Sequence, residues 1–282
     1  IDPGDEVIVL EPFYENYGPD AILSQATPVF LTLEAPAYRL DRDRLAALIT
    51  PRTRAIVLNS PNNPMGRVFD REELQGVADL CIEHDLLALT DEIYEHFIYG
   101  GAEFVSLPVA APEAAGRCVV VNSVAKTYAM TGWRVGWMIG PPEVAAAVAR
   151  LQSHSISNVA NVSQFAAIAA LEGPMDPVDA MRTAFDRRRR TMFDMLRTLP
   201  GVEVNEPHGA LYAFPRVDVA RALPGRPAAS SHEFAEILLE TAEIAVVPGE
   251  AFGSPGSVRL SYALDDADLV AGLERWRDLA RA

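Results

Sequence analysis

Short, almost uninterrupted apolar runs alternate with helical patterns through the first half of the chain. Each run is bounded by proline, glycine or polar residues. Such runs are typical of strands buried on both faces, as in a parallel sheet covered by helices. The predicted strands are residues 6–10, 29–33, 54–59, 86–90, 118–121 and 137–139.

The segments between these runs carry helix signals. Asp70 stands three residues before Glu73 in the pattern of a capping box, which predicts a helix that ends near His84. Asp41 is placed to cap a second helix over residues 42–49. Strands that alternate with helices predict an α/β fold, with a mostly parallel sheet flanked by helices.

The pattern changes after Gly140. An alanine-rich helical stretch starts at Pro142, and Gly173 with Pro174 interrupts it before a second helix over 177–199. Four consecutive arginines at 187–190 on that helix are interpreted as a solvent-exposed face.

The last third of the chain mixes short strands with helices. Strands are predicted at 202–205, 210–216, 244–247 and 258–262, and helices at 231–241 and 265–280. This mixture indicates a smaller α+β unit. We therefore predict a large α/β domain over 1–178 and a small C-terminal domain over 179–282.

Composition narrows the classes of function. The 282 residues are 49% hydrophobic, enough for a large core, and the net charge of −15 argues against nucleic acid and anionic membranes as partners. No apolar run reaches the roughly 20 residues that span a bilayer. Cys81 and Cys118 lie far apart in apolar surroundings, which favours buried free thiols in a cytoplasmic protein. No metal site is expected, because the histidines lack ligand spacing: His84, His96, His154, His208 and His232.

Polar residues follow three of the inner strands. Asn63 lies in the loop after 54–59, Asp91 and Tyr94 come after 86–90, and Ser123 and Lys126 come after 118–121. Each has an ordinary alternative as a turn residue, a helix cap or part of the core. Ligands in open α/β sheets bind outside the carboxyl ends of the strands, so the joint pattern predicts one shared site.

The residues around Lys126 indicate the chemistry of that site. A lysine that is partly buried near Arg134 is disfavoured as an ammonium ion, and its neutral amine can form a Schiff base with an aldehyde. The hydroxyl of Ser123 and the guanidinium of Arg134 suit a phosphate. An aldehyde next to a phosphate suggests pyridoxal 5′-phosphate.

The stretch from Ser123 to Gly136 resembles the lysine motif of fold-type I, class I/II pyridoxal-phosphate-dependent aminotransferases. The segment Ser60-Pro-Asn-Asn63-Pro-Met-Gly66 is similar to a loop of that family, and Asp91-Glu-Ile-Tyr94 to another of its motifs. The resemblance implies that Lys126 is the Schiff-base lysine and, with Asp91 and Tyr94, part of the catalytic set. It also implies a homodimer.

The remaining roles come from the same resemblance. Asp91 would hold the ring nitrogen, Tyr94 and Asn63 the phenolic oxygen, and Ser123 with Arg134 the phosphate. Tyr14 would stack on the ring. Arg259, which lies on an apolar strand and needs an anionic partner, would bind the substrate α-carboxylate near Asn63. The chain departs from the motifs of the family at Ser60, Met65 and Ala125, which are neighbours of the predicted site residues.

The expected activity is transfer of an α-amino group from an L-amino acid to a 2-oxo acid. β-Elimination, decarboxylation or oxidation with the same cofactor remains open, because these reactions share one carbanion. A ligand-sensing domain of a transcription regulator is the alternative outside enzymes. Because the chain opens directly on a strand and lacks the family's N-terminal phosphate-binding segment, we expect the natural protein to extend before Ile1.

Overall fold

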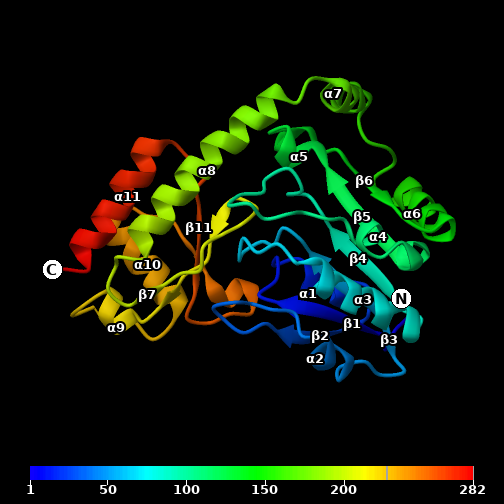
Figure 1. Cartoon of the computed structure of the whole chain (residues 1–282), viewed down its shortest axis with the longest axis horizontal. Helices are drawn as coiled ribbons and strands as arrows, with labels where there is room; N and C mark the ends of the chain where they lie inside the picture. Colours follow the sequence, from blue (N-terminus) through cyan, green and yellow to red (C-terminus); the bar gives the residue numbers. More distant parts are fainter. Residues whose placement is uncertain (227, 282) are drawn as a thin grey trace.

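The computed structural model describes residues 1–226 and 228–281 and is built around a six-stranded sheet (Figure 1). The strand order is β2-β1-β3-β4-β5-β6, and all neighbours are parallel except β5 and β6. The strands are β1 Glu6–Glu11, β2 Thr27–Thr32, β3 Thr53–Asn59, β4 Leu87–Asp91, β5 Cys118–Ser123 and β6 Gly136–Ile139. The predicted α/β class is confirmed, and each of the six strands predicted for this sheet is found with small shifts at its ends.

The carboxyl ends of β3, β4 and β5 meet at one edge of the sheet. The register pairs Asn59 with Asp91, and Asp91 with Val121. The segments that follow these three strands therefore leave the sheet side by side.

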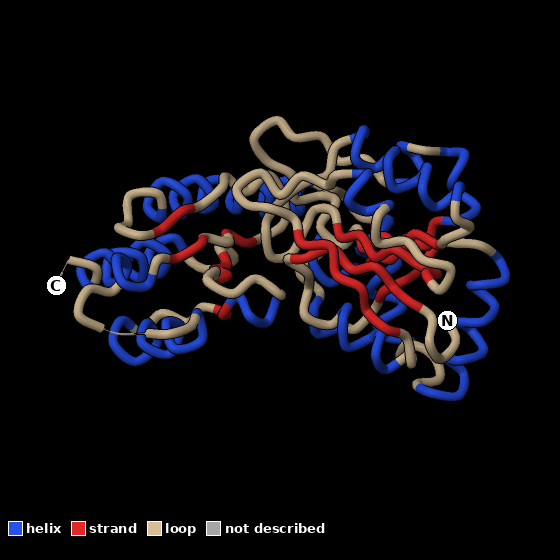
Figure 2. The backbone as a smooth tube through the Cα atoms, turned by 90° about the horizontal axis from the view of Figure 1, so that it is seen from below, coloured by secondary structure: helices blue, strands red, loops and turns tan. Residues whose placement is uncertain are grey.

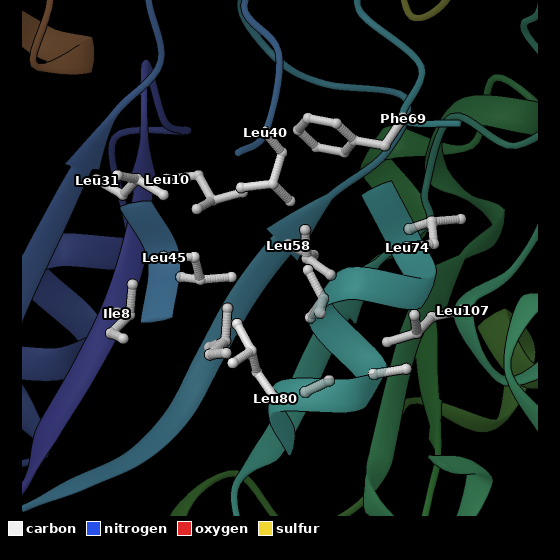
Figure 3. Close-up of a cluster of buried hydrophobic side chains, with 14 of the residues drawn as sticks. Ile8, Leu10, Leu31, Leu40, Leu45, Leu58, Phe69, Leu74, Leu80 and Leu107 are labelled. Atoms are coloured by element: carbon white, nitrogen blue, oxygen red, sulfur yellow. The ribbon is translucent and has the colours of Figure 1, made fainter. Parts of the chain in front are cut away.

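Helices cover both faces of the sheet. On one face α2 (Arg42–Ala46), α3 (Arg71–Glu83) and α4 (Leu107–Ala110) pack on a core that contains Ile8, Leu10 and Leu58, shown in Figure 3. On the other face α1 (Tyr17–Leu23) packs through Ala21 on the alternate residues of the strands. This alternation follows from the two-residue period of a β-strand.

The predicted caps are confirmed. Asp70 accepts a hydrogen bond from Glu73 N, and Glu73 Oε2 accepts one from Asp70 N, which completes the capping box of α3. Asp41 caps α2, which ends at Ala46 and is shorter than predicted.

The alanine-rich stretch is two helices, and the prediction of one was wrong. Helix α6 covers Pro142–Ser155 and α7 covers Asn161–Glu172. Ser157 between them has φ of 60°, a left-handed conformation that a helix cannot contain. Beyond α7, α8 (Asp176–Leu196) runs into the C-terminal part, where it lies next to α11 (Figure 1).

The C-terminal part has two small sheets, which Figure 2 shows apart from the large one. The three-stranded sheet has the order β10-β11-β8, and β7 pairs with β9. The predicted strand 210–216 is split at Pro215, which has no backbone N–H to donate, into β8 and β9. The strands are β7 Val202–Glu203, β8 Tyr212–Ala213, β9 Arg216–Val217, β10 Val247–Pro248 and β11 Val258–Ser261. The helices are α9 Val219–Ala222, α10 Ser231–Ala242 and α11 Asp266–Leu279.

A second hydrophobic core holds this part together. It combines residues of α8, α10 and α11 with Tyr94, Phe97 and Tyr99, which follow β4. Because the first half contributes to this core, the domain boundary near 178 stays a prediction. Cys81 and Cys118 are buried and free as predicted, and burial raises the pKa of Cys81 to about 12. Among the described helices, none has the length and apolarity to cross a bilayer.

The four arginines on α8 do not form one exposed face as predicted. The side chain of Arg189 is only 2% exposed and contacts Asp186 and Glu206, while Arg187 and Arg188 pair with Asp266 on α11. Arg189 lies on the apolar stripe of the helix, four residues after Phe185 and three before Met192.

Candidate active site

A cavity of about 300 Å³ opens beyond the ends of β3 and β4. It brings together side chains from six separate stretches of the sequence. Six of the predicted site residues line it: Tyr14, Asn63, Asp91, Tyr94, Lys126 and Arg259. Glu15, Tyr17, Asn59, Ile93 and Tyr212 complete the lining.

The ends of β3 and β4 are linked by Asn59. Its Nδ2 donates to the backbone oxygen of Asp91 (3.0 Å), and its Oδ1 accepts a hydrogen bond from Asn63 N (2.8 Å). The last residue of β3 thus fixes both the loop that carries Asn63 and the position of Asp91.

Asp91 is a carboxylate with few donors around it. Tyr17 donates to Oδ2 (2.7 Å) and Ile93 N to Oδ1 (3.1 Å). Burial raises the pKa of Asp91, although both hydrogen bonds and the charge of Lys126 act in the opposite direction. A cationic N–H group in the cavity would relieve the cost of burying this charge.

Lys126 is the single lysine in the sequence. It sits on the short helix α5 (Val124–Thr127), whose N-terminus is capped by Ser123 through a bond from Ala125 N to Oγ (2.9 Å). Its Nζ lies 5.9 Å from the centre of the Tyr94 ring. It makes no hydrogen bond or ion pair within the described residues, so the amine is available to a ligand.

Arg259 reaches the cavity from β11. Its guanidinium lies 4.5 Å from the ring centre of Tyr212 and 4.8 Å from that of Phe252. Nη1 donates to Asn63 Oδ1 (2.9 Å) and lies 3.9 Å from Glu15 Oε2. A guanidinium has five N–H donors, so most of its hydrogen-bonding capacity is left for a ligand.

Ser123 and Arg134 lie beside the first cavity and not in it. They line a second cavity of about 550 Å³ that shares Asp91 and Ile93 with the first. Arg134 is exposed, and its Nη1 donates to Thr131 O (3.1 Å).

Sequence reasoning missed the five other lining residues, Asn59 and Ile93 among them. Tyr17 is bonded to Asp91 from 74 positions away, the hydroxyl of Tyr212 lies 3.0 Å from that of Tyr94, and Glu15 faces Arg259. Tyr17 and Glu15 lie within three residues of Tyr14, the one residue of this segment with a predicted role. Nothing in the local pattern marks Tyr212.

The side chains present fit pyridoxal 5′-phosphate. The first cavity offers an unpaired amine for an aldehyde and a buried carboxyl group whose raised pKa calls for a cationic partner. The adjoining cavity offers a hydroxyl and a guanidinium for a phosphate. The donor set therefore suits the aldehyde, the ring nitrogen and the phosphate of this group.

Solved structures share the fold. The aspartate aminotransferase of Rhizobium meliloti matches with a TM-score of 0.94 at 36% identity, over 100% of this chain and 72% of that one. An aromatic aminotransferase from Pyrococcus horikoshii matches with a TM-score of 0.93 at 35% identity, over 100% and 74% of the two chains.

Relatives found by sequence are also aminotransferases. An aspartate aminotransferase of Streptomyces avermitilis is 50% identical over 99% of this chain and 69% of its own length. An asparagine–oxo-acid transaminase of Streptococcus mutans is 39% identical over 98% and 70%. The family model of class I and II aminotransferases matches residues 1–275. The chain belongs to the class I and II aminotransferase family.

Proposed function

We propose that this aminotransferase works with pyridoxal 5′-phosphate held by Lys126. In this proposal Asp91 interacts with the cofactor ring and Arg259 binds the substrate. The observation that carries the proposal is the single cavity in which the amine, the carboxyl group and the guanidinium meet. The bound cofactor supplies an aldehyde that accepts the amino group and a ring that stabilises negative charge at the substrate α-carbon.

The residues around the cofactor have distinct tasks. Lys126 is the amine that would hold the aldehyde and the base that would move the proton at the substrate α-carbon. Asp91 keeps a proton on the ring nitrogen by opposite charge, and Tyr17 orients Asp91. Tyr94 and Asn63, which line the same cavity, would donate hydrogen bonds to the phenolic oxygen, and Tyr14 would cover the ring.

The phosphate and the substrate are held by arginines. Ser123 and Arg134 would hold the phosphate from the adjoining cavity, which shares Asp91 with the first. Arg259 binds the α-carboxylate of the substrate, and its hydrogen bond to Asn63 fixes its orientation toward the cavity. The rings of Tyr212 and Phe252 lie against the guanidinium and restrict its movement, which suits bidentate binding of a carboxylate.

The lone lysine makes a decisive test simple. The purified protein is incubated with the cofactor, reduced with borohydride and digested, and the peptides are identified by mass spectrometry. We expect one modified lysine peptide, and its mass should place the label on Lys126, the one lysine among these 282 residues. Lys126→Ala should abolish that peptide and lower kcat/KM by about 10³-fold or more.

The control is Arg197→Lys, which places a lysine at an exposed position at the end of α8, outside α6 and α7. Only Lys126 should be modified in this variant. Equal modification of both positions, or none at Lys126 in the parent protein, would reject the proposed attachment site.

We propose aspartate as an amino donor, supported by relatives of that activity at up to 50% identity. A screen of amino acids with 2-oxoglutarate would test it by following the 2-oxo acid produced. Release of ammonia without a dependence on the 2-oxo acid would instead favour β-elimination.

We also propose that the protein acts as a homodimer in the cytoplasm. Support for the dimer comes from apolar side chains exposed on and between α6 and α7: Val148, Leu151, Ile156, Val162, Phe165, Ile168 and Leu171. Apolar area of this extent is rarely left to solvent. The mass in solution, measured by light scattering at micromolar concentration, tests the dimer.

A further inference from the structure

Glu15 is the one charged residue of the first cavity that has no part in the proposed function. Its Oε2 is buried and accepts no hydrogen bond from the described residues, although the side chain as a whole is 42% exposed. A buried carboxylate oxygen without a donor is costly unless a ligand or a nearby cation compensates. The cation at hand is Arg259, with Nη1 at 3.9 Å.

The separation of 3.9 Å is informative. It exceeds a hydrogen bond, so the two groups attract each other without being joined. Arg259 cannot tilt freely toward Glu15, because the Tyr212 and Phe252 rings lie against it and Nη1 already donates to Asn63. Its remaining N–H donors are left without an acceptor among the described residues, although a negative charge lies beside them.

We propose that Glu15 is a competing counter-ion for Arg259, and that it sets how tightly the enzyme holds the carboxylate of its substrate. The inference rests on the proposed role of Arg259 as the carboxylate-binding residue. Without a ligand, Glu15 balances the charge of the guanidinium. When an amino acid or a 2-oxo acid binds, its carboxylate takes over Arg259 and meets the negative charge of Glu15.

Two consequences follow from the charges. Glu15 weakens the binding of every carboxylate at Arg259, and it weakens dicarboxylates most because they bring two negative charges into the cavity. The same repulsion speeds the release of the 2-oxo acid product, because only the bound state is raised in energy. Glu15 thus lowers the affinity for substrate and raises the rate of product release, although it does not contact the reacting atoms.

The test measures the binding of maleate to the cofactor-loaded enzyme by calorimetry, independently of activity. Glu15→Gln keeps the shape and removes the charge, and we expect the Kd for maleate to fall roughly three- to tenfold. Glu15→Ala, which removes the charge without adding an amide, should shift the Kd in the same direction. The KM for the amino donor should fall as well.

The matched control is Glu240→Gln, the same substitution at an exposed position of α10. It should leave the Kd unchanged, and an equal fall in this variant would assign the effect to net charge and overturn the inference. An unchanged or higher Kd in both Glu15 variants would also overturn it, while the proposed function would stand. If maleate fails to bind any variant or the parent enzyme, Arg259 is not a carboxylate site, and both proposals fail.

Discussion

Two arginines, Arg189 and Arg259, are withdrawn from solvent in very different surroundings. Arg189, with a side chain 2% exposed, donates from Nε to Asp186 Oδ1 (2.9 Å) and from Nη1 to Glu206 Oε1 (2.6 Å) and Pro207 O (3.0 Å). Arg259, with a side chain 16% exposed, donates only to the neutral amide of Asn63 within the described residues. The charge of Arg189 is balanced inside the protein, whereas the charge of Arg259 is available to a ligand.

The carboxyl groups in the two regions differ in the same way. Although burial raises it, hydrogen bonds from Arg190 and Arg189 bring the pKa of Asp186 below its ordinary value. In the cavity, burial dominates and the pKa of Asp91 is raised. Charged groups that lack a partner inside the protein therefore distinguish the binding site from the structural ion pairs more clearly than burial does.

The contrast between the two arginines is tested most directly by replacing each of them with methionine. Arg259→Met should lower kcat/KM by roughly 10²- to 10³-fold, because the substrate carboxylate loses its partner. The melting temperature should change little, because Asn63 is the one hydrogen-bond partner of Arg259 within the described residues and the methionine side chain can still pack against the rings of Tyr212 and Phe252. Steady-state kinetics and thermal melts of the same preparation measure both. A large loss of stability with normal kinetics would make Arg259 a structural residue.

Arg189→Met should show the opposite pattern. Removing the guanidinium leaves Asp186 and Glu206 without their buried partner, which costs about 3 kcal/mol of unfolding free energy. The cost is at the low end for a buried pair because both carboxylates remain partly open to water. Urea unfolding measures it. An intact unfolding free energy would show that this network contributes nothing to stability.

Local patterns carried most of the fold. The six strands of the large sheet and the cap of α3 could be predicted because the hydrophobic period and the capping box act within a few residues. The failures at Ser157 and Pro215 also have local causes, a left-handed residue and a missing N–H. Arg189 was misjudged because four arginines in a row hide the fact that one of them falls on the apolar stripe.

The site was predictable only in part, for a different reason. Asn63, Asp91 and Lys126 follow strands whose carboxyl ends must meet, so topology alone brings them together. Tyr212 and Glu15 reach the cavity from a small sheet and a loop, and no periodicity specifies that approach. Their roles depend on distances to Tyr94 and Arg259 that exist only in the folded chain.

The pH dependence of stability gives the finest test of the contrast between the two regions. Because the pKa of Asp91 is raised on folding, its contribution to stability is present below the unfolded value of about 3.9 and is lost as pH rises through the folded pKa. Asparagine does not ionise. Without cofactor, the melting temperature of Asp91→Asn relative to the parent should therefore increase as pH rises from about 4, and then level off.

With the cofactor bound, the charge of Asp91 should stabilise the protein, whereas without the cofactor it destabilises it. The proton on the ring nitrogen gives Asp91 the cationic partner that its pocket lacks, so the parent protein should gain more thermal stability from the cofactor than Asp91→Asn does. Thermal melts between about pH 4 and pH 8, with and without cofactor, measure both effects. Equal stabilisation of the two proteins would show that Asp91 does not face the ring nitrogen.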